Sequence, residues 1–219
     1  TRNALEFRKR IEDRYGEQRR ADAERKLYRI DGSKAGDNTV TYDKGGFVFW
    51  MLAERMGRAN TLRGMHDFLA AMQGNEDHPA LEDLVRHLRR YAPDTVSYDD
   101  FTRQWFDTVV VPEYKVDSAA TRHDGKGFVT TAVVRNAGTG RMPVDVAVTR
   151  GERFPEDTTK HADAPWIDVR TTVTLGAGER QRVEIRSDFE PDHVVVDPDV
   201  KVLQLRRKSA EAKVKAGRS

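Results

Sequence analysis

The chain has 219 residues, of which 37% are apolar and 34% charged, and its net charge is +2. This length allows one large domain or two small ones, and no stretch approaches the roughly 20 apolar residues that a membrane-spanning helix needs. The absence of cysteine excludes disulfides and thiolate metal sites, but it indicates no cellular compartment. Because the chain starts at Thr1 without a signal-like segment, we expect it to be part of a longer protein.

The charge is distributed unevenly along the chain. Residues 1–30 carry a net +4 and residues 206–219 carry +5, which leaves −7 for the body between them. A nucleic-acid binder would usually have a basic body with aromatic stacking platforms, so we expect no nucleic-acid partner. The basic ends are typical of a solvated helix face and a frayed tail.

The first half of the chain has the pattern of a helical bundle. Residues 3–29 mix charges around few apolar positions, as in an exposed or loosely docked helix, with a break at Gly16. A loop is expected over residues 29–38, which are rich in glycine and short polar residues. Apolar residues then recur at helical spacing in four segments bounded by glycine or proline: 46–56, 60–73, 79–92 and 97–107.

Within these helices the spacing also predicts which side chains face the core. One apolar stripe is expected in the second segment, formed by Leu62, Met65, Phe68, Leu69 and Met72. In the last segment, Phe101, Trp105 and Phe106 are expected to face inward. Ser97, three residues before Asp100, has the spacing of a capping box at the start of that helix.

The composition changes near Val111-Pro112, after which β-branched residues alternate with polar ones. In residues 144–149, Val144, Val146 and Val148 share one face of a predicted half-buried strand. About seven such strands, the last at 200–205, fit within about 95 residues, a spacing typical of an antiparallel sandwich. The sequence therefore predicts an α+β protein of two domains: an all-α helical bundle over 1–110, an immunoglobulin-like β-sandwich over 113–205, and a basic tail over 206–219.

One short motif stands at the entry of the first predicted bundle helix. Tyr42, Asp43, Lys44 and Gly45 directly precede the apolar segment "GFVFWMLAERMG", which is followed by "NTLRGMHDFLAAMQ" and "SYDDFTRQWFD". This order resembles the gluzincin zinc aminopeptidases of the membrane-alanyl-aminopeptidase family, in which a Tyr-Glu-Lys-Gly element follows the zinc site. The β-rich residues 113–205 are similar to the sandwich that follows the catalytic domain in many members, so the resemblance covers about three quarters of the chain.

The sequence departs from the family in one respect that limits what the resemblance implies. Members bind zinc through H-E-x-x-H and a later glutamate, and none of the six histidines here begins such a motif. Asp43 also stands where glutamate is commoner. The resemblance thus implies a C-terminal portion that holds no cofactor itself, with zinc expected in the intact parent protein. Peptides would be the substrate, and some relatives are joined to membrane-spanning segments outside this region.

By the same resemblance, Tyr42 is the expected catalytic residue. Zinc peptidases attack the scissile carbonyl with a metal-activated water, and negative charge builds on the carbonyl oxygen. A phenol, whose pKa is ordinarily about 10, can donate a hydrogen bond to that oxygen at neutral pH. Lys44 and Gly45 would bind substrate or position the loop. The alternative is that Tyr42 is a half-buried residue at a helix entry that Asp43 caps.

Other residues that could ligate a metal form weaker patterns. Histidines stand beside carboxylates at His66-Asp67, Glu76-Asp77-His78, His123-Asp124 and Asp192-His193, but adjacent side chains diverge, so no metal site is predicted there. Asp197 and Asp199 resemble an acidic calcium turn, although two carboxylates are too few.

Two functions therefore compete at the level of the sequence. The first is the C-terminal portion of a zinc-dependent aminopeptidase that contributes Tyr42 and one wall of the cleft and is inactive alone. The second is a non-enzymatic helical and immunoglobulin-like adaptor, or a descendant of the peptidase that has lost its zinc site. Zinc ligands upstream of Tyr42 in the parent would distinguish them.

Overall fold

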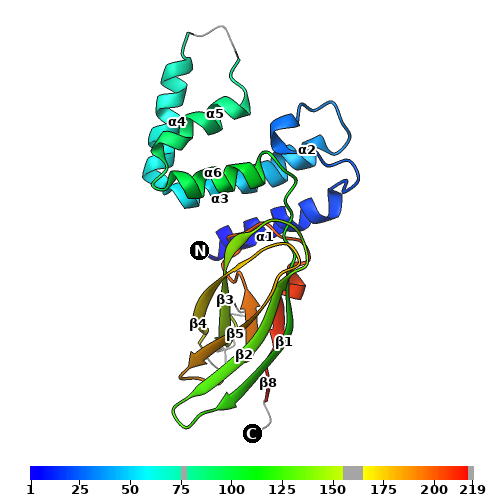
Figure 1. The fold of residues 1–219 in the computed structure, drawn as a ribbon, viewed down its shortest axis with the longest axis vertical. Coiled ribbons are helices and arrows are strands. Elements are labelled where there is room, and N and C mark those ends of the chain that lie inside the picture. The colour runs from blue at the N-terminus through cyan, green and yellow to red at the C-terminus, as the bar shows by residue number, and fades with distance from the viewer. Residues whose placement is uncertain (75–77, 155–164, 217–219) are drawn as a thin grey trace. The chain divides into compact units, whose positions relative to one another are not determined.

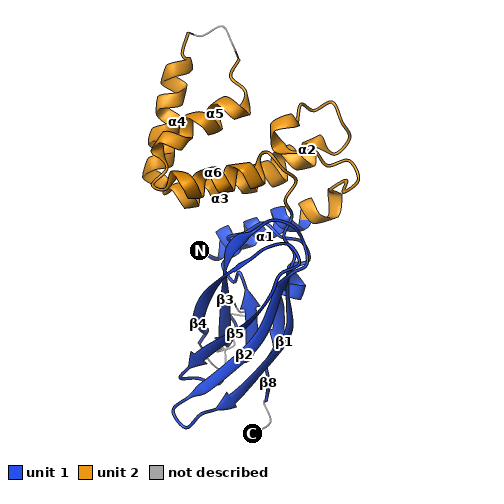
Figure 2. Ribbon diagram, viewed as in Figure 1, with its two compact units in different colours: residues 1–13, 111–219 blue, residues 14–110 orange. Residues whose placement is uncertain are grey.

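The computed structural model describes residues 1–74, 78–154 and 165–216, and within them helices come first and strands follow, giving a mixed α+β chain (Figure 1). The backbone divides into two compact units (Figure 2). Unit 1 comprises residues 1–13 and 111–219, and unit 2 comprises residues 14–110. The first 13 residues thus belong with the strands, whereas the sequence placed them with the helical bundle.

Unit 2 is helical. Its elements are the end of α1 (Arg2–Gln18), a short 3₁₀ turn at Leu27–Arg29, α2 (Asp37–Thr39), the π-helix η2 (Val40–Gly45), α3 (Gly46–Met56), α4 (Arg58–Met72), α5 (Leu81–Leu88), a 3₁₀ turn at Arg89–Tyr91 and α6 (Thr95–Trp105). Helices α3 and α6 lie side by side, and α4 packs against α5 (Figure 1). The largest fully buried side chains of this unit are those of Tyr15, Lys44, Phe47, Leu52, Met56, Leu88, Tyr98, Phe101, Trp105 and Phe106.

The ends of these helices follow local rules, with two differences from the sequence expectation. Gly57 ends α3 with a φ of 80°, a backbone conformation that glycine adopts without strain. Helix α6 is capped by Asp94, whose carboxylate accepts from the backbone N–H groups of Val96 and Ser97, so Ser97 is not the cap. Gly16 does not break α1, which continues to Gln18.

The inward face of α4 differs from the predicted stripe. Thr61, Gly64 and Phe68 are buried, while Leu62, Met65 and Leu69 are exposed. A Cβ atom on Gly64 would lie 2.7 Å from Leu88 and 2.9 Å from Tyr91, so the helices approach each other through this glycine. Of the predicted stripe, Phe68 is buried as expected, whereas Leu62, Met65 and Leu69 were misassigned, because a glycine that makes the contact contributes no apolar side chain to the pattern.

Unit 1 contains two four-stranded sheets. The strands are β1 (Tyr114–His123), β2 (Phe128–Asn136), β3 (Met142–Arg150), β4 (Ile167–Leu175), β5 (Arg180–Ser187), β6 (His193–Val196), β7 (Glu211–Lys213) and β8 (Lys215–Ala216). Their order is β5-β2-β1-β8 in one sheet and β4-β3-β6-β7 in the other. All pairs are antiparallel except β1 with β8.

Alternation places the valines of these strands in the core. Val144, Val146 and Val148 of β3 are buried, as their spacing predicts, and Val194 and Val196 of β6 are buried beside them. Strands β1 to β6 lie within the predicted β-rich region, but residues 200–205, expected to be the last strand, form no strand.

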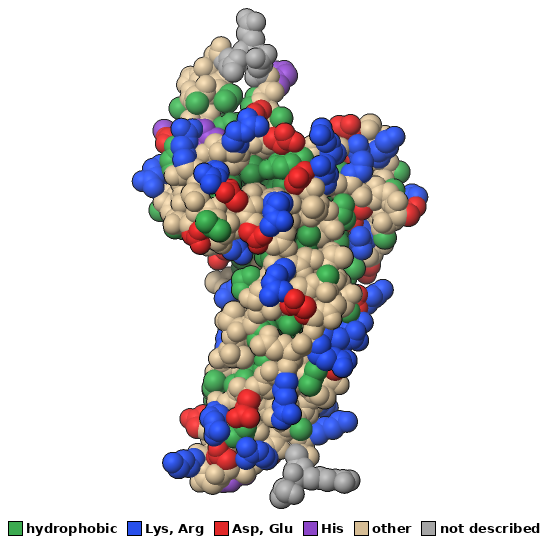
Figure 3. Space-filling model, viewed as in Figure 1, with side chains coloured by type: hydrophobic (Ala, Val, Ile, Leu, Met, Phe, Trp, Pro, Cys, Tyr) green, Lys and Arg blue, Asp and Glu red, His purple; other side chains and the backbone are tan. Residues whose placement is uncertain are grey.

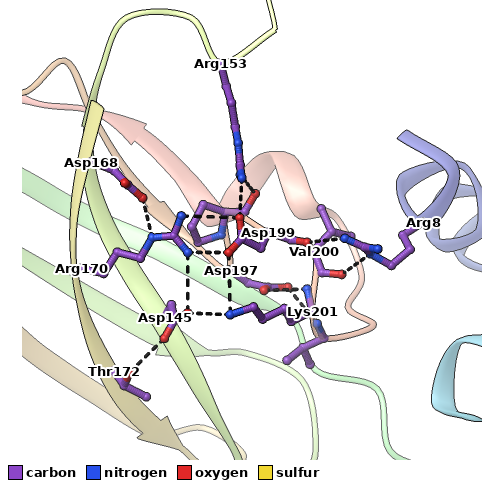
Figure 4. Close-up of polar contacts among 12 residues, drawn as sticks. Arg8, Asp145, Arg153, Asp168, Arg170, Thr172, Asp197, Asp199, Val200 and Lys201 are labelled. Atoms are coloured by element: carbon purple, nitrogen blue, oxygen red, sulfur yellow. Dashed lines mark hydrogen bonds and ion pairs between the residues drawn. The ribbon is translucent and has the colours of Figure 1, made fainter. Parts of the chain in front are cut away.

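The end of the described chain is integrated into unit 1 and does not form the expected tail. Residues 207–210 form a 3₁₀ turn that leads into β7 and β8. Arg207 is enclosed, and it donates to the Glu12 carboxylate at 2.6 and 2.8 Å and to Asp197 Oδ2 at 3.0 Å. Arg8 of α1 also donates to the backbone carbonyls of Asp199 and Val200 (Figure 4). These contacts explain why α1 begins as part of unit 1.

Candidate functional site

The motif that contains Tyr42 forms an unusual helical segment. Residues 40–45 form the π-helix η2, which follows α2 and continues into α3 without a break, since Gly45 and Gly46 both have right-handed helical dihedrals. Single turns of π-helix are rare and occur frequently at functional sites. The segment is preceded by Gly36, whose φ of 94° turns the chain into α2.

The side chains of this segment point in different directions. Tyr42 is 74% exposed, whereas Asp43 and Lys44, its next two neighbours, are buried at 3% and 1%. Tyr42 is therefore not the half-buried residue of the alternative interpretation. The three residues do not converge on one point: the phenol is presented to solvent, and the two charged groups are turned into unit 2.

Asp43 is held by α1. Both of its carboxylate oxygens accept from Arg14 Nε at 3.0 Å, and Arg14 Nη2 also bonds Oδ1. Such a two-pronged contact fixes orientation as well as distance. Asp43 is thus a tether between η2 and α1 and does not cap α3, whose N-terminal position, Gly45, has no side-chain cap.

Lys44 lies in a closed polar cluster. Its Nζ is 2.6 Å from Glu24 Oε1, which also accepts from the Tyr15 hydroxyl at 2.7 Å, and Arg19 Nε donates to Glu24 Oε2 at 2.9 Å. The Lys44 ammonium also lies 5.8 Å from the centre of the Tyr15 ring. Because its head group is enclosed by these partners, Lys44 anchors the segment from inside and its ammonium does not reach the surface.

Burial sets the titration of this cluster. Burial lowers the pKa of Lys44, and the negative charge of Glu24 opposes this shift because it favours the charged ammonium. It would raise the pKa of Glu24, but the nearby Lys44 together with the Tyr15 and Arg19 contacts lowers that pKa overall. It also raises the pKa of Tyr15, as does the adjacent Glu24 carboxylate. The raised pKa of Tyr15 keeps its phenol neutral at neutral pH, so its hydroxyl can donate to Glu24.

Gly45 has closer neighbours than Gly46. A Cβ atom there would lie 3.3 Å from the Val40 carbonyl oxygen and 3.6 Å from Leu27, whereas one on Gly46 would meet nothing within 4 Å. Steric crowding thus favours glycine at position 45, whereas position 46 has room for a side chain.

The sequence reasoning missed Arg14, Tyr15, Arg19 and Glu24 as partners of the motif. Two features of the sequence pointed to these ion pairs. Residues 3–29 carry many charges but few apolar residues that could pack them against the rest of the chain, and Asp43 and Lys44 place two opposite charges beside an apolar helix. Sequence spacing does not reveal which of these charges pair with each other, because the partners are 20 to 29 residues apart.

The carboxylates that were weighed as metal ligands have other partners. Asp197 binds Arg207 and the backbone N–H groups of Lys201 and Val202. Asp199 binds Arg153 at 2.6 Å and Arg170 at 2.5 Å (Figure 4), which lowers its pKa to about 2 although burial opposes this shift. Both carboxylates are already neutralised by arginine.

The histidine pairs do not assemble either. His66 meets only its neighbour Asp67 in an exposed contact of 3.0 Å, and His193 lies 3.9 Å from Glu211. Glu76 and Asp77 lie outside the described residues. Across residues 1–74, 78–154 and 165–216, no three histidine or carboxylate side chains come together as a metal-binding group.

Two further features concern nucleic-acid and membrane partners: the distribution of charge on the surface and the apolar length of the helices. On the face seen in Figure 3, basic and acidic side chains are interspersed. In the described ranges, no helix combines the length and apolar character required to span a bilayer.

No family model and no curated protein matches this chain. Among solved structures, the chain is similar in part to the crystal structure of DesR, a β-glucosidase from Streptomyces venezuelae, in complex with D-glucose. The identity is 26% and the TM-score 0.28, over 35% of this chain and 10% of that one. A match of this extent to a tenth of the other chain supports no statement about activity here.

Proposed function

We propose that this chain is the C-terminal portion of a zinc-dependent aminopeptidase, in which Tyr42 stabilises the anionic intermediate of peptide hydrolysis. The observation that supports the proposal is the contrast within η2: a 74% exposed phenol lies next to two side chains that are buried and ion-paired. An exposed aromatic residue on a surface loop is ordinary, but one held by two buried anchors on the following residues is preorganised to donate.

Preorganisation is what makes such a donor effective. Water adds to the carbonyl carbon of the N-terminal peptide bond, and the carbonyl oxygen becomes an oxyanion that the Tyr42 hydroxyl stabilises by donating a hydrogen bond. When the intermediate collapses, the C–N bond breaks; the oxygen of the water remains in the new carboxylate, and its protons pass to the released amine. A donor that is already in place requires no reorganisation at that moment.

The zinc implied by the family resemblance does not fit the described residues of this chain, which offer no group of three ligands. We therefore place its ligands in a part of the parent protein outside these 219 residues, and expect the isolated chain to be inactive. Asp43 and Lys44, which are buried and ion-paired, would hold the segment that carries Tyr42 without touching the substrate.

The same proposal extends to the architecture. We propose that the two sheets of unit 1 form an immunoglobulin-like sandwich and that the two units are separate domains. Burial alternates along β5 and β6, one strand of each sheet, and β1 contacts β6 and β7 while β4 contacts β5, which are contacts between the two sheets. Separate expression of residues 111–216 joined to residues 1–13 by a short linker, followed by thermal unfolding, would test independent folding.

The test of the catalytic role is Tyr42→Phe in the intact parent protein. Loss of one oxyanion donor typically lowers turnover by about 100- to 1,000-fold, and we expect at least about a tenfold loss with zinc content and melting temperature unchanged. Unaltered turnover would refute the role of Tyr42.

A second candidate is the non-enzymatic adaptor. One observation favours it: the exposed side chains of Leu62, Met65 and Leu69 form an apolar stripe on α4 that the described residues leave uncovered. If the intact protein binds no zinc and hydrolyses no aminoacyl amide, the adaptor becomes the better interpretation.

A further inference from the structure

An apolar groove of about 560 Å³ lies in unit 2 against the segment that carries Tyr42. Its lining is mostly apolar and includes Tyr28, Thr41, Gly45, Gly46, Phe49 and Phe106. The volume falls within the range of about 300–1,000 Å³ that is usual for small-ligand sites. The groove is therefore large enough for a bulky side chain and part of the backbone that carries it.

The groove and Tyr42 share one face of the helical segment. Thr41, Gly45, Gly46 and Phe49 line the groove, and the exposed Tyr42 directly follows Thr41 in the chain. Asp43 and Lys44 lie on the opposite, buried side. The exposed positions of the segment therefore include Tyr42 together with the groove residues Thr41 and Gly46.

The lining selects against charge. It contains no ionisable group except Tyr28, whose pKa is raised to about 12, first by burial and then by the nearby Glu82 and Asp107, so this phenol stays neutral at physiological pH. The Tyr28 and Phe106 rings pack together with their centres 5.6 Å apart. A charged side chain placed here would lose its hydration without gaining a partner, whereas an aliphatic or aromatic one would lose little.

We propose that this groove binds an aliphatic or aromatic side chain of the peptide substrate, next to the bond whose carbonyl oxygen faces Tyr42. This inference rests on the proposed peptidase function and adds to it a preference for large apolar residues. The occupant is a substrate side chain because the groove is apolar, uncharged and continuous with the face that presents the catalytic phenol.

The test is Gly46→Leu in the intact parent protein. A Cβ atom at this position meets nothing within 4 Å and the backbone is right-handed helical, so leucine causes no strain and extends into the groove. Turnover is measured for two substrate series, in which the residue on either side of the scissile bond is varied among Ala, Leu, Phe, Glu and Lys.

For one of the two positions, the wild-type protein should prefer Leu or Phe over Ala, Glu and Lys. Gly46→Leu should lower kcat/KM for the large apolar residues at that position by roughly tenfold or more, while the Ala substrate changes little. Gly46→Ala should act in the same direction with a smaller effect, and it serves if the leucine variant does not fold. Ala70→Leu, which adds the same side chain at an exposed position of α4, should change neither series.

Three results would overturn the inference. The first is a wild-type enzyme without the apolar preference, and the second is a ratio of kcat/KM for the Leu and Ala substrates that Gly46→Leu leaves unchanged. The third is an equal loss of kcat/KM for every substrate, which would indicate that another part of the parent protein fills the groove. Tyr42→Phe separates this failure from that of the function itself: if that variant loses turnover while Gly46→Leu leaves the ratio unchanged, the peptidase role stands and only the groove assignment falls.

Discussion

The ammonium of Lys44 and the carboxylate of Glu24 form an ion pair of 2.6 Å in which both side chains are almost completely buried. The pair joins the π-helix η2 to the segment that follows α1, two parts of unit 2 that are 20 residues apart in the sequence. An ion pair of this kind contributes little net stability compared with a well-packed apolar pair, but its loss on one side leaves a buried charge without a partner.

Lys44→Met should destabilise unit 2 by about 1–3 kcal/mol, because Glu24 would stay buried, lose its closest counter-charge and retain only Arg19. Denaturant unfolding monitored by circular dichroism measures this. Arg103→Met, which breaks the exposed pair of Arg103 with Asp100, is the matched control and should cost less than about 1 kcal/mol. Equal losses in the two variants would contradict the burial of the Lys44 pair.

Removal of the hydroxyl should destabilise unit 2 at one of its tyrosines, Tyr15, and have little effect at another, Tyr42. Tyr15→Phe removes the donor to Glu24 Oε1 from a fully buried site and should cost about 1–3 kcal/mol. Tyr42→Phe changes an exposed side chain and should alter the unfolding free energy by less than about 0.5 kcal/mol. Thermal and chemical unfolding of the isolated chain measure both. A large loss in Tyr42→Phe would mean that the phenol supports the fold and is not free for substrate.

Local elements of this fold could be predicted from the sequence, whereas contacts between distant residues could not. The strand at Met142–Arg150 follows from the alternation of its valines, and the start of α3 at Gly46 follows from the apolar helical spacing after the glycine pair. Both are local patterns with a single period. The partners of Lys44 and Arg207 are not local, since they lie 20 and 195 residues away, and no periodicity specifies them.

The face of α4 was misjudged for a related reason. Leu62, Met65 and Leu69 satisfy helical spacing as well as the true inward set does, and only the close approach of Leu88 and Tyr91 to Gly64 decides between them. Similarly, the charges of residues 206–219 suggested a solvated tail because charge is usually exposed. The buried contacts of Arg207 with Glu12 and Asp197 reverse that assignment.

Two glycine substitutions should have opposite effects on the stability of unit 2. Gly64→Ala places a Cβ atom 2.7 Å from Leu88 and should destabilise by about 1–3 kcal/mol through overpacking. Gly46→Ala meets open space in a right-handed helical conformation and should stabilise by about 0.4–1 kcal/mol, because it restricts the unfolded chain. Denaturant midpoints of the two variants, compared at equal m-values, measure the difference. A neutral Gly64→Ala would mean that α4 does not approach α5 as closely as described.

In unit 1, the buried carboxylates of Glu12 and Asp197 share one guanidinium, and this arrangement has a pH signature. Burial raises the pKa of Glu12, although Arg207 opposes the shift, and burial likewise raises the pKa of Asp197. A carboxyl whose folded-state pKa is raised contributes stability that is fully present below its unfolded-state pKa and is lost as the pH rises through the folded-state value. We therefore expect the unfolding free energy of the wild-type chain, minus that of Glu12→Gln, to decrease as the pH is raised from about 4 to about 8. Chemical unfolding across this range measures it, and Glu17→Gln, at an exposed position of the same helix, should give a flat difference. A difference that increases with pH would mean that Arg207 outweighs burial and lowers the pKa of Glu12.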